Sequence, residues 1–268
     1  MSNLAKRLIV ALFGIPILSC VVYFGGWFLY VFCILISVLG SLELAAMLLA
    51  KNFELNKKLI TLLTIVLVSV FQFSWFGKLG LLIPFILIFL AAYLIIIESG
   101  VDKFLSRLSM SIFGIIYPGF LISFTILTHR EFAPHGWIIL LFVFANTWLA
   151  DTFAYSFGRW FGKKKLAPKV SPGKTWVGFI AAFFGGFIAA YLASLLLKDQ
   201  YSIFILMIAS VAATFFGQIG DLIESAIKRD CGVKDSSNLL PGHGGVLDRF
   251  DSLLFAVPAV YFVLKFFG

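Results

Sequence analysis

The strongest constraint on the fold is a series of continuous apolar runs that repeats along almost the whole chain. Each run is about 17–25 residues long, the length that an α-helix needs to cross the ~30 Å hydrocarbon core of a bilayer. Only helices and closed barrels satisfy every backbone group in lipid, and these runs lack the alternation of barrel strands. The sequence therefore predicts an all-α, polytopic integral membrane protein of about nine transmembrane helices, at residues 8–24, 27–49, 59–76, 79–97, 110–128, 136–158, 176–197, 203–227 and 250–267.

The composition agrees with a chain that lies mostly in lipid. Hydrophobic residues make up 61% of the 268 residues and charged residues only 13%, about half of the ~25% that is usual in soluble domains. We expect one membrane domain over residues 1–268, with no room for a separate soluble domain. Residues 1–135 are nearly free of polar groups and are expected to form scaffold helices, whereas residues 136–268 carry the polar stripes expected of a catalytic half.

The lysines and arginines are distributed unequally between alternate loops. Of the 21 basic residues, 17 fall on the side of the N-terminus and 4 on the other side. Because cytoplasmic loops carry an excess of Lys and Arg, we expect the N-terminus inside and the C-terminus outside a cell (inner) membrane. The net charge of +8 is then explained by these loops and their contact with anionic lipid, so nucleic acid is not an expected partner.

One stretch, residues 217–252, departs from this apolar pattern. It holds six of the 13 acidic residues and His243, which is one of three histidines. Charges of both signs are costly beside apolar helices, so their presence favours a chemical role. The other isolated acid is Glu43, within the second span, where a functional role and simple pairing are both open.

Polar residues at helical spacing mark two of the spans. In the sixth, Thr147, Asp151, Tyr155 and Arg159 follow one another at intervals of four, as a functional stripe or as an internal Asp–Arg pair. In the eighth, a stripe of five residues must face other helices or a water-filled cavity; it comprises Thr214, Gln218, Asp221, Ser225 and Lys228.

The loop between the sixth and seventh spans contains SPGKT at residues 171–175. It is not a phosphate-binding P-loop, because that motif requires a glycine where this chain has Pro168. We expect a flexible turn in which Lys174 and Thr175 open the seventh helix. Backbone amides at a helix N-terminus, together with a lysine, favour phosphate binding by Ser171 and Lys174.

The glycine-rich turn at residues 241–245 allows the chain to fold back after the eighth span. Asp248 would then approach Asp221, and two carboxylates held together require a cation between them. Oxygen ligands favour Mg²⁺, which binds a few carboxylates together with substrate phosphates. Magnesium flanked by basic residues is suited to phosphoryl or nucleotidyl transfer.

The segment SAIKRDCGVKDSSNLLPGHGGVLDRFDS, residues 225–252, resembles the signature of the phosphatidate cytidylyltransferases, also called CDP-diacylglycerol synthases. SPGKTWVG at residues 171–178 and the span that contains Asp151 resemble further family segments, although Val177 stands where many members carry a polar residue. The resemblance implies transfer of the cytidylyl group of CTP to phosphatidic acid, giving CDP-diacylglycerol and pyrophosphate in phospholipid synthesis. It also implies Mg²⁺, with a second cation as a further candidate, bound by Asp221 and Asp248.

The candidate site residues fall into three groups. The catalytic candidates are Asp221, Lys228, Asp248 and Arg249. The substrate-binding candidates are Ser171, Lys174, Thr175, Ser225, Arg229, Lys234, His243, Gly244 and Gly245. The metal-binding candidates are Asp221 and Asp248, with Asp151 and Asp251 as further ones.

Two other functions remain open from the residues. One is a different CTP-dependent lipid phosphotransferase, such as a polyprenol kinase. The other is an ion-coupled transporter that would use Asp151 and Glu43, although transporters usually show repeat symmetry. Membrane lipid is the expected surrounding in each case, the active site is expected to face the cytoplasm, and a homodimer is one candidate assembly.

Overall fold

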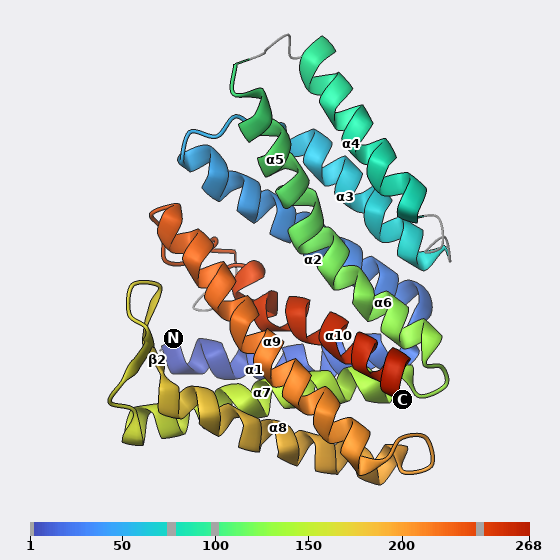
Figure 1. The fold of residues 1–268 in the computed structure, drawn as a ribbon, viewed down its shortest axis with the longest axis vertical. Helices are drawn as coiled ribbons and strands as arrows, with labels where there is room; N and C mark the ends of the chain where they lie inside the picture. Colours follow the sequence, from blue (N-terminus) through green and yellow to red (C-terminus); the bar gives the residue numbers. More distant parts are fainter. Residues whose placement is uncertain (1–2, 74–78, 98–101, 240–243) are drawn as a thin grey trace.

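The computed structural model describes residues 3–73, 79–97, 102–239 and 244–268. It is all-helical apart from one short hairpin (Figure 1). The helices are α1 (Asn3–Phe24), α2 (Gly26–Ala50), α3 (Lys57–Gln72), α4 (Leu79–Ile96), α5 (Phe104–Ile115), the π-helical turn η2 (Ile116–Phe120), α6 (Leu121–Glu131), α7 (Gly136–Phe161), α8 (Trp176–Leu197), α9 (Ile203–Asp230) and α10 (Leu247–Phe267).

Each predicted run coincides with a helix in the described part of the chain. The fifth run belongs to a longer rod, Phe104–Glu131, in which α5, η2 and α6 follow one another without a break. The π-turn contains Pro118. Because proline has no N–H and its ring clashes with the carbonyl one turn earlier, the regular hydrogen-bond ladder cannot continue there.

The loop before α8 is not the flexible turn that the sequence suggested. Strands β1 (Lys165–Ala167) and β2 (Ser171–Thr175) pair antiparallel, which satisfies backbone groups that a free loop would leave to water. The Lys164 carbonyl also accepts a hydrogen bond of 3.1 Å from the Trp176 amide, at the first residue of α8. Thr175 begins the helix as expected, since its hydroxyl accepts from the Gly178 amide at 3.1 Å.

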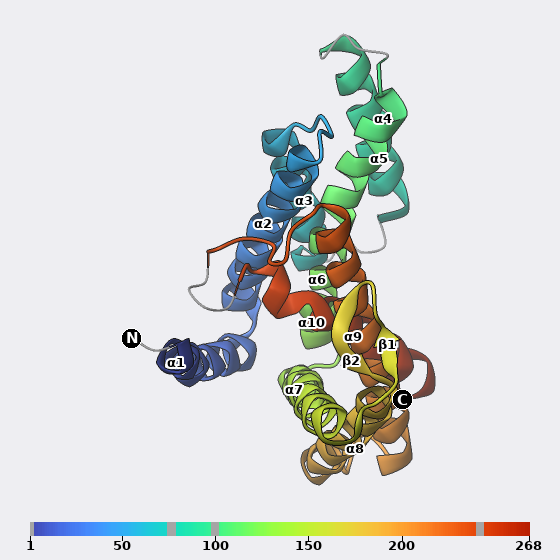
Figure 2. The ribbon, with the colours of Figure 1, turned by 90° about the vertical axis from the view of Figure 1, so that its left-hand side faces the viewer.

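The helices form two groups that meet at α10. Figures 1 and 2 show α2 to α6 on one side and α7, α8 and α9 on the other, with α10 packed against α6, α7 and α9. Close approach of backbones holds the second group together. A methyl group added to Gly178 would lie 2.6 Å from the Ala154 carbonyl of α7, and one added to Gly220 would lie 2.6 Å from the Asp251 carbonyl of α10. Small residues at helix contacts are typical of membrane bundles.

The outer surface of the bundle is apolar. Large hydrophobic side chains are exposed on many helices; Phe204 is 69% exposed and Ile96 is 71% exposed. In the described part of the chain, six helices are long and apolar enough to cross a membrane, and two shorter apolar segments lie at 14–24 and 82–96. The helix α3, with 16 residues, is about 24 Å long, which is shorter than the hydrocarbon core. An all-α, multi-pass membrane protein is the architecture that fits this surface.

The fold gathers the charged segments at one side. The C-terminal ends of α7 and α9, the N-terminal ends of α8 and α10 and the β-hairpin all lie at the side that faces the viewer in Figure 2. The turn that joins α8 to α9 lies at the opposite side of the molecule (Figure 1).

Candidate active site

A polar cavity of about 540 Å³ opens between α7, α8, α9 and the β-hairpin. Its wall combines two acids, three basic side chains, hydroxyl groups and glycines. The lining residues are Asp151, Ala154, Tyr155, Gly158, Arg159, Gly162, Lys165, Leu166, Ser171, Gly173, Lys174, Thr175, Gly178, Phe179, Gln218 and Asp221.

Asp221 lies in the wall of this cavity and forms an ion pair with Lys174. The Lys174 Nζ lies 2.7 Å from the Asp221 Oδ2, and the two side chains are 23% and 31% exposed. The other carboxylate oxygen, Oδ1, accepts a hydrogen bond of 3.2 Å from the Ser225 hydroxyl one turn later on α9. The predicted phosphate-binding lysine and the predicted metal-binding acid therefore meet, although they are 47 positions apart in the chain.

Asp151 and Asp251 lie near Asp221 and near each other. Both are close enough to Asp221 to interact with it electrostatically, and Asp151 also interacts with Lys174 and Arg249. The contact of α9 and α10 at Gly220 explains the approach of Asp251. The three aspartates come from three different helices, α7, α9 and α10, so like charge accumulates at one end of the bundle.

Asp248 belongs to a second charged cluster, which is centred on Lys228. The Lys228 ammonium bridges the carboxylates of Glu224 and Asp248, and all three side chains are largely buried. Asp248 Oδ2 additionally accepts from the Ser236 amide (2.8 Å), the Ser236 hydroxyl (2.8 Å) and the Gly245 amide (2.7 Å). Asp221 and Asp248 are thus held on neighbouring helices, each with its own lysine.

The isolated acid Glu43 is drawn into this second cluster. It is buried, and its carboxylate accepts hydrogen bonds from the Ser236 and Ser237 hydroxyls and from the Val246 and Leu247 amides. The sequence left open whether Glu43 has a functional role or is simply paired, and the structure shows that its carboxylate has hydrogen-bond partners.

Several predicted residues have other partners than expected. Arg159 donates to the Tyr155 hydroxyl at 3.0 Å, and it forms no ion pair with Asp151 among the described residues. Arg229 donates to the carbonyls of Val233 (3.0 Å) and Val170 (3.4 Å), so it ties α9 to the hairpin.

The remaining candidates vary in position. Thr175 uses its hydroxyl as a helix cap, and Lys234 and Arg249 are exposed. Gly244 adopts a φ of +78°, which favours glycine. His243 lies outside the described residues.

Some residues of the site could not be predicted from the sequence. Ser236 and Ser237 follow Asp235 in a polar segment without periodicity, and their roles depend on α2, almost two hundred residues earlier. Tyr117 is buried in η2, and its hydroxyl makes no hydrogen bond in the described part of the chain. It lies near the acids, since it interacts electrostatically with Glu224, Asp251 and Asp221.

The donor chemistry of the site fits a hard cation. No cluster of three or more acids, histidines or cysteines among the described residues is arranged to enclose a metal ion. Mg²⁺ does not need such a cluster, because it keeps several waters and binds one or two carboxylates plus phosphates. The carboxylates around Asp221 supply oxygen only, and Glu224 Oε1 and the Tyr117 hydroxyl are buried without a hydrogen-bond partner among the residues described.

Cys231 is not suited to covalent catalysis. It lies just after α9 as a free thiol. Burial and the nearby Asp230 charge raise the pKa of the Cys231 thiol above its ordinary value. The thiol is therefore protonated at neutral pH, whereas the thiolate is the nucleophile.

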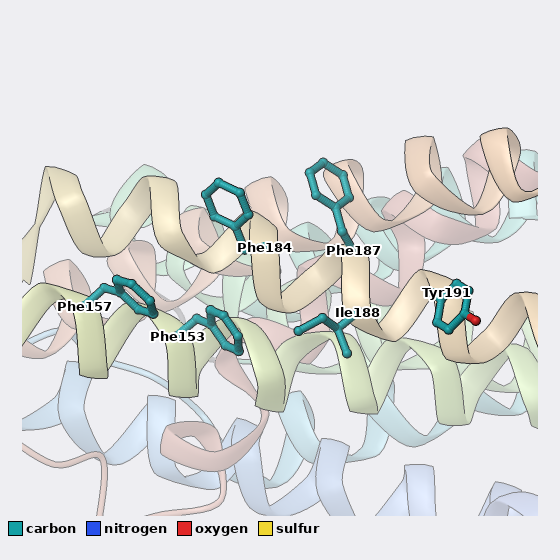
Figure 3. A pocket seen from close by; sticks show the side chains of 6 residues that line it. All are labelled: Phe153, Phe157, Phe184, Phe187, Ile188 and Tyr191. Atoms are coloured by element: carbon teal, nitrogen blue, oxygen red, sulfur yellow. The ribbon is translucent and has the colours of Figure 1, made fainter.

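A second cavity, of about 580 Å³, lies between α7 and α8 and is shown in Figure 3. It is lined by aromatic and aliphatic side chains, namely Phe153, Phe157, Phe184, Phe187, Ile188 and Tyr191. A wall without charged groups cannot neutralise a nucleotide, so the polar cavity beside Asp221 is the candidate active site.

The chain is similar to proteins of one family along almost its whole length. The model of the cytidylyltransferase family matches residues 5–267. Proteins named phosphatidate cytidylyltransferase from Staphylococcus saprophyticus and Staphylococcus epidermidis are each 32% identical to the chain, over 96% of it and 98% of their own length. The protein of that name from Haemophilus influenzae is 50% identical over 135 residues, which is 49% of this chain and 46% of the relative.

Proposed function

We infer that the chain, which belongs to the cytidylyltransferase family, is a phosphatidate cytidylyltransferase. The reaction joins CTP and phosphatidic acid and yields CDP-diacylglycerol and pyrophosphate. Full-length relatives of that name carry the assignment. The polar cavity at the end of an apolar bundle supports it, because one substrate is a water-soluble polyanion and the other a membrane lipid.

The reaction requires charge neutralisation more than proton transfer. A phosphate oxygen of phosphatidic acid forms a bond to the α-phosphorus of CTP, and the bond from that phosphorus to the β-phosphate oxygen breaks. The bonding electrons leave with pyrophosphate. The attacking oxygen is already ionised, so no strong general base is needed, and catalysis depends on positioning two anions and stabilising the charge between them.

The basic side chains of the cavity are suited to bind the phosphates of CTP. Lys174, Lys165 and Arg159 line the wall, together with Ser171 of the hairpin. Lys174 stands at the start of α8, where the helix N-terminus adds a favourable field for anions. We propose that Lys174 exchanges the Asp221 carboxylate for a substrate phosphate when the substrates bind.

We propose Asp221 and Asp248 as the main residues that hold Mg²⁺, with Asp151 and Asp251 near enough to assist. In the structure a lysine ammonium neutralises each of the two main acids, as a metal cation would. Bound Mg²⁺ would supply a positive charge to the phosphates of CTP. The residues Lys228, Arg249 and Lys234 remain proposed phosphate contacts, and Gly244, Gly245, Ser225, Arg229, Thr175 and His243 proposed parts of the substrate site.

The membrane arrangement is proposed from the helices and the charge distribution. Nine crossings would place the cavity at the cytoplasmic surface and the C-terminus outside, because the predicted loops on the side of the N-terminus carry 17 of the 21 basic residues. CTP would then enter from the cytoplasm and phosphatidic acid from the surrounding lipid. A homodimer is compatible with this arrangement.

Two labels on CTP test the reaction with purified protein in detergent. With Mg²⁺ and phosphatidic acid, we expect label from the α-phosphate in the lipid product and label from the γ-phosphate in pyrophosphate. A CTP-dependent kinase would instead place the γ-label in the lipid. Chelation of the cation should stop the transfer, and a polyprenol in place of phosphatidic acid should give no product; equal transfer to both lipids would contradict the assignment.

A further inference from the structure

The carboxylate of Glu43 is the common acceptor for four donors from a segment about two hundred residues away. Glu43 lies about two turns before the C-terminal end of α2, and it is only 7% exposed. The donors are the hydroxyls of Ser236 (2.9 Å) and Ser237 (2.6 Å) and the amides of Val246 (2.8 Å) and Leu247 (2.9 Å). Each carboxylate oxygen of Glu43 thus faces one hydroxyl and one backbone amide, Ser237 and Val246 at Oε1 and Ser236 and Leu247 at Oε2.

These donors lie at both ends of the segment that leads into α10. Val246 and Leu247 open the helix, where amides have no partner within the helix and where negative charge is favoured. No side chain of the segment itself caps α10 among the described residues. Glu43 therefore caps α10 from another helix, and the two serine contacts hold the start of the same segment to α2.

The same segment holds Asp248. The Ser236 hydroxyl lies 2.9 Å from Glu43 Oε2 and 2.8 Å from Asp248 Oδ2, so the two carboxylates share one hydroxyl. Gly245 also lies between them, since its amide donates to Asp248. A methyl group added to Gly245 would lie 2.5 Å from both Glu43 oxygens, so no larger residue fits.

We propose that Glu43 is a positioning residue of the transfer reaction, which holds Ser236, Ser237 and the first turn of α10 and thereby the orientation of Asp248. It does not contact the polar cavity; it acts through Ser236 and the first turn of α10. The proposal rests on the proposed function in that Asp248 serves the reaction. Groups that orient a metal-binding carboxylate typically change activity or metal affinity by about 10–100-fold when they are replaced.

Three variants separate this role from a general contribution to folding. Glu43→Gln keeps the size of the side chain but places an NH₂ group against donors, and Glu43→Asp keeps the charge. Ser41→Ala is the matched control, because Ser41 is also buried on α2 and, among the described residues, its side chain bonds to Thr64 and the Gly114 carbonyl and not to the segment that leads into α10. Ser237→Ala removes a single Glu43 contact, should Glu43→Gln fold poorly.

The loss of activity should depend on loss of the Glu43 contacts, and not on replacement of a buried residue of α2 as such. We expect Glu43→Gln to lower kcat about 10–100-fold and to raise the Mg²⁺ concentration for half-maximal rate, with the KM for CTP changed less than about threefold. Glu43→Asp and Ser237→Ala should fall between Glu43→Gln and the wild type, and Ser41→Ala should match the wild type.

A spin label at Asn238, which is exposed within the segment, gives a readout independent of metal and turnover. In a background without the three native cysteines, Glu43→Gln should increase the mobility of the label, and Ser41→Ala should not. If Glu43→Gln and Ser41→Ala behave alike in both measurements while the wild type is active, the positioning role is wrong. If the wild type itself transfers no cytidylyl group, the proposed function fails instead.

Discussion

Lys174 and Lys228 each neutralise one of the acids on which the proposed chemistry depends. Lys174 pairs with Asp221 at the cavity wall, whereas Lys228 lies between Glu224 and Asp248 in a more buried place. The difference in exposure implies different roles. Lys174 can turn from Asp221 to a phosphate within the cavity, whereas Lys228 can contact a phosphate only while it stays paired with the two buried carboxylates.

Replacing either main acid by its amide should remove turnover. We expect Asp221→Asn and Asp248→Asn each to lower kcat about 100-fold or more, because an amide oxygen carries no charge to hold the cation near the phosphates. Asp230→Asn is the control, since Asp230 lies on α9 too but its ion pair in the described part of the chain is with Lys51 at the surface. The rate of labelled CTP transfer measures the effect, and near-wild-type activity of either variant would remove that residue from the metal site.

Removing the buried lysine should affect stability as well as activity. We expect Lys228→Met to lower the free energy of unfolding by about 3–5 kcal/mol, because it leaves uncompensated buried charge. Lys51→Met breaks the more exposed pair with Asp230 and should cost less than about 1 kcal/mol. Thermal unfolding in detergent distinguishes the two, and equal losses would show that burial of the Lys228 cluster is unimportant.

At the scale of elements, the β-hairpin has the most direct influence on the site. It ends at Thr175, whose hydroxyl caps α8, and it carries Ser171 and Lys174 into the cavity wall. The cap and the hairpin are therefore one unit, and the position of Lys174 depends on how α8 begins.

Loss of that cap should reduce activity more than an equivalent loss elsewhere. We expect Thr175→Ala and Ser202→Ala each to cost about 1 kcal/mol of stability, because each removes a helix cap. Ser202 caps α9 at the opposite side of the bundle, so only Thr175→Ala should also raise the KM for CTP. Similar KM values for the two variants would contradict a role of the hairpin in nucleotide binding.

Much of the element structure could be predicted, because lipid imposes a simple rule. A helix long enough to cross a bilayer must be apolar along its length, and all nine runs coincide with helices. The hairpin could not be predicted, since SPGKT has no alternation and its pairing depends on Lys165 to Ala167. The sequence predicted Asp221 as a metal ligand and Lys174 as a phosphate contact, but it did not predict that the two form an ion pair. No feature of the sequence around Glu43 predicted its contacts.

At the scale of the whole molecule, all segments that contribute to the polar cavity end at the same side. This arrangement requires an even number of crossings between the β-hairpin and the segment before α10. In the proposed topology, the turn after α8 then lies on the opposite surface of the membrane.

Cysteine labelling tests the orientation directly. In a background without native cysteines, we expect Asp199→Cys, in the turn after α8, to react with a membrane-impermeant maleimide added to intact cells. Asn238→Cys should react only after the membrane is opened, because the basic loops on its side are predicted to be cytoplasmic. Labelling of Asn238→Cys in intact cells would reverse the proposed topology.

The contact between Glu43 and the segment before α10 also sets an order of events during synthesis. Its donors follow Glu43 by 193 to 204 positions, so the ribosome adds them long after α2 has entered the membrane. Contacts of such high sequence separation form late and slow the folding of a chain. Asp248 can therefore take its final orientation only when α10 docks. A nascent chain that ends within α9 already contains Asp151 and Lys174 but still lacks Asp248.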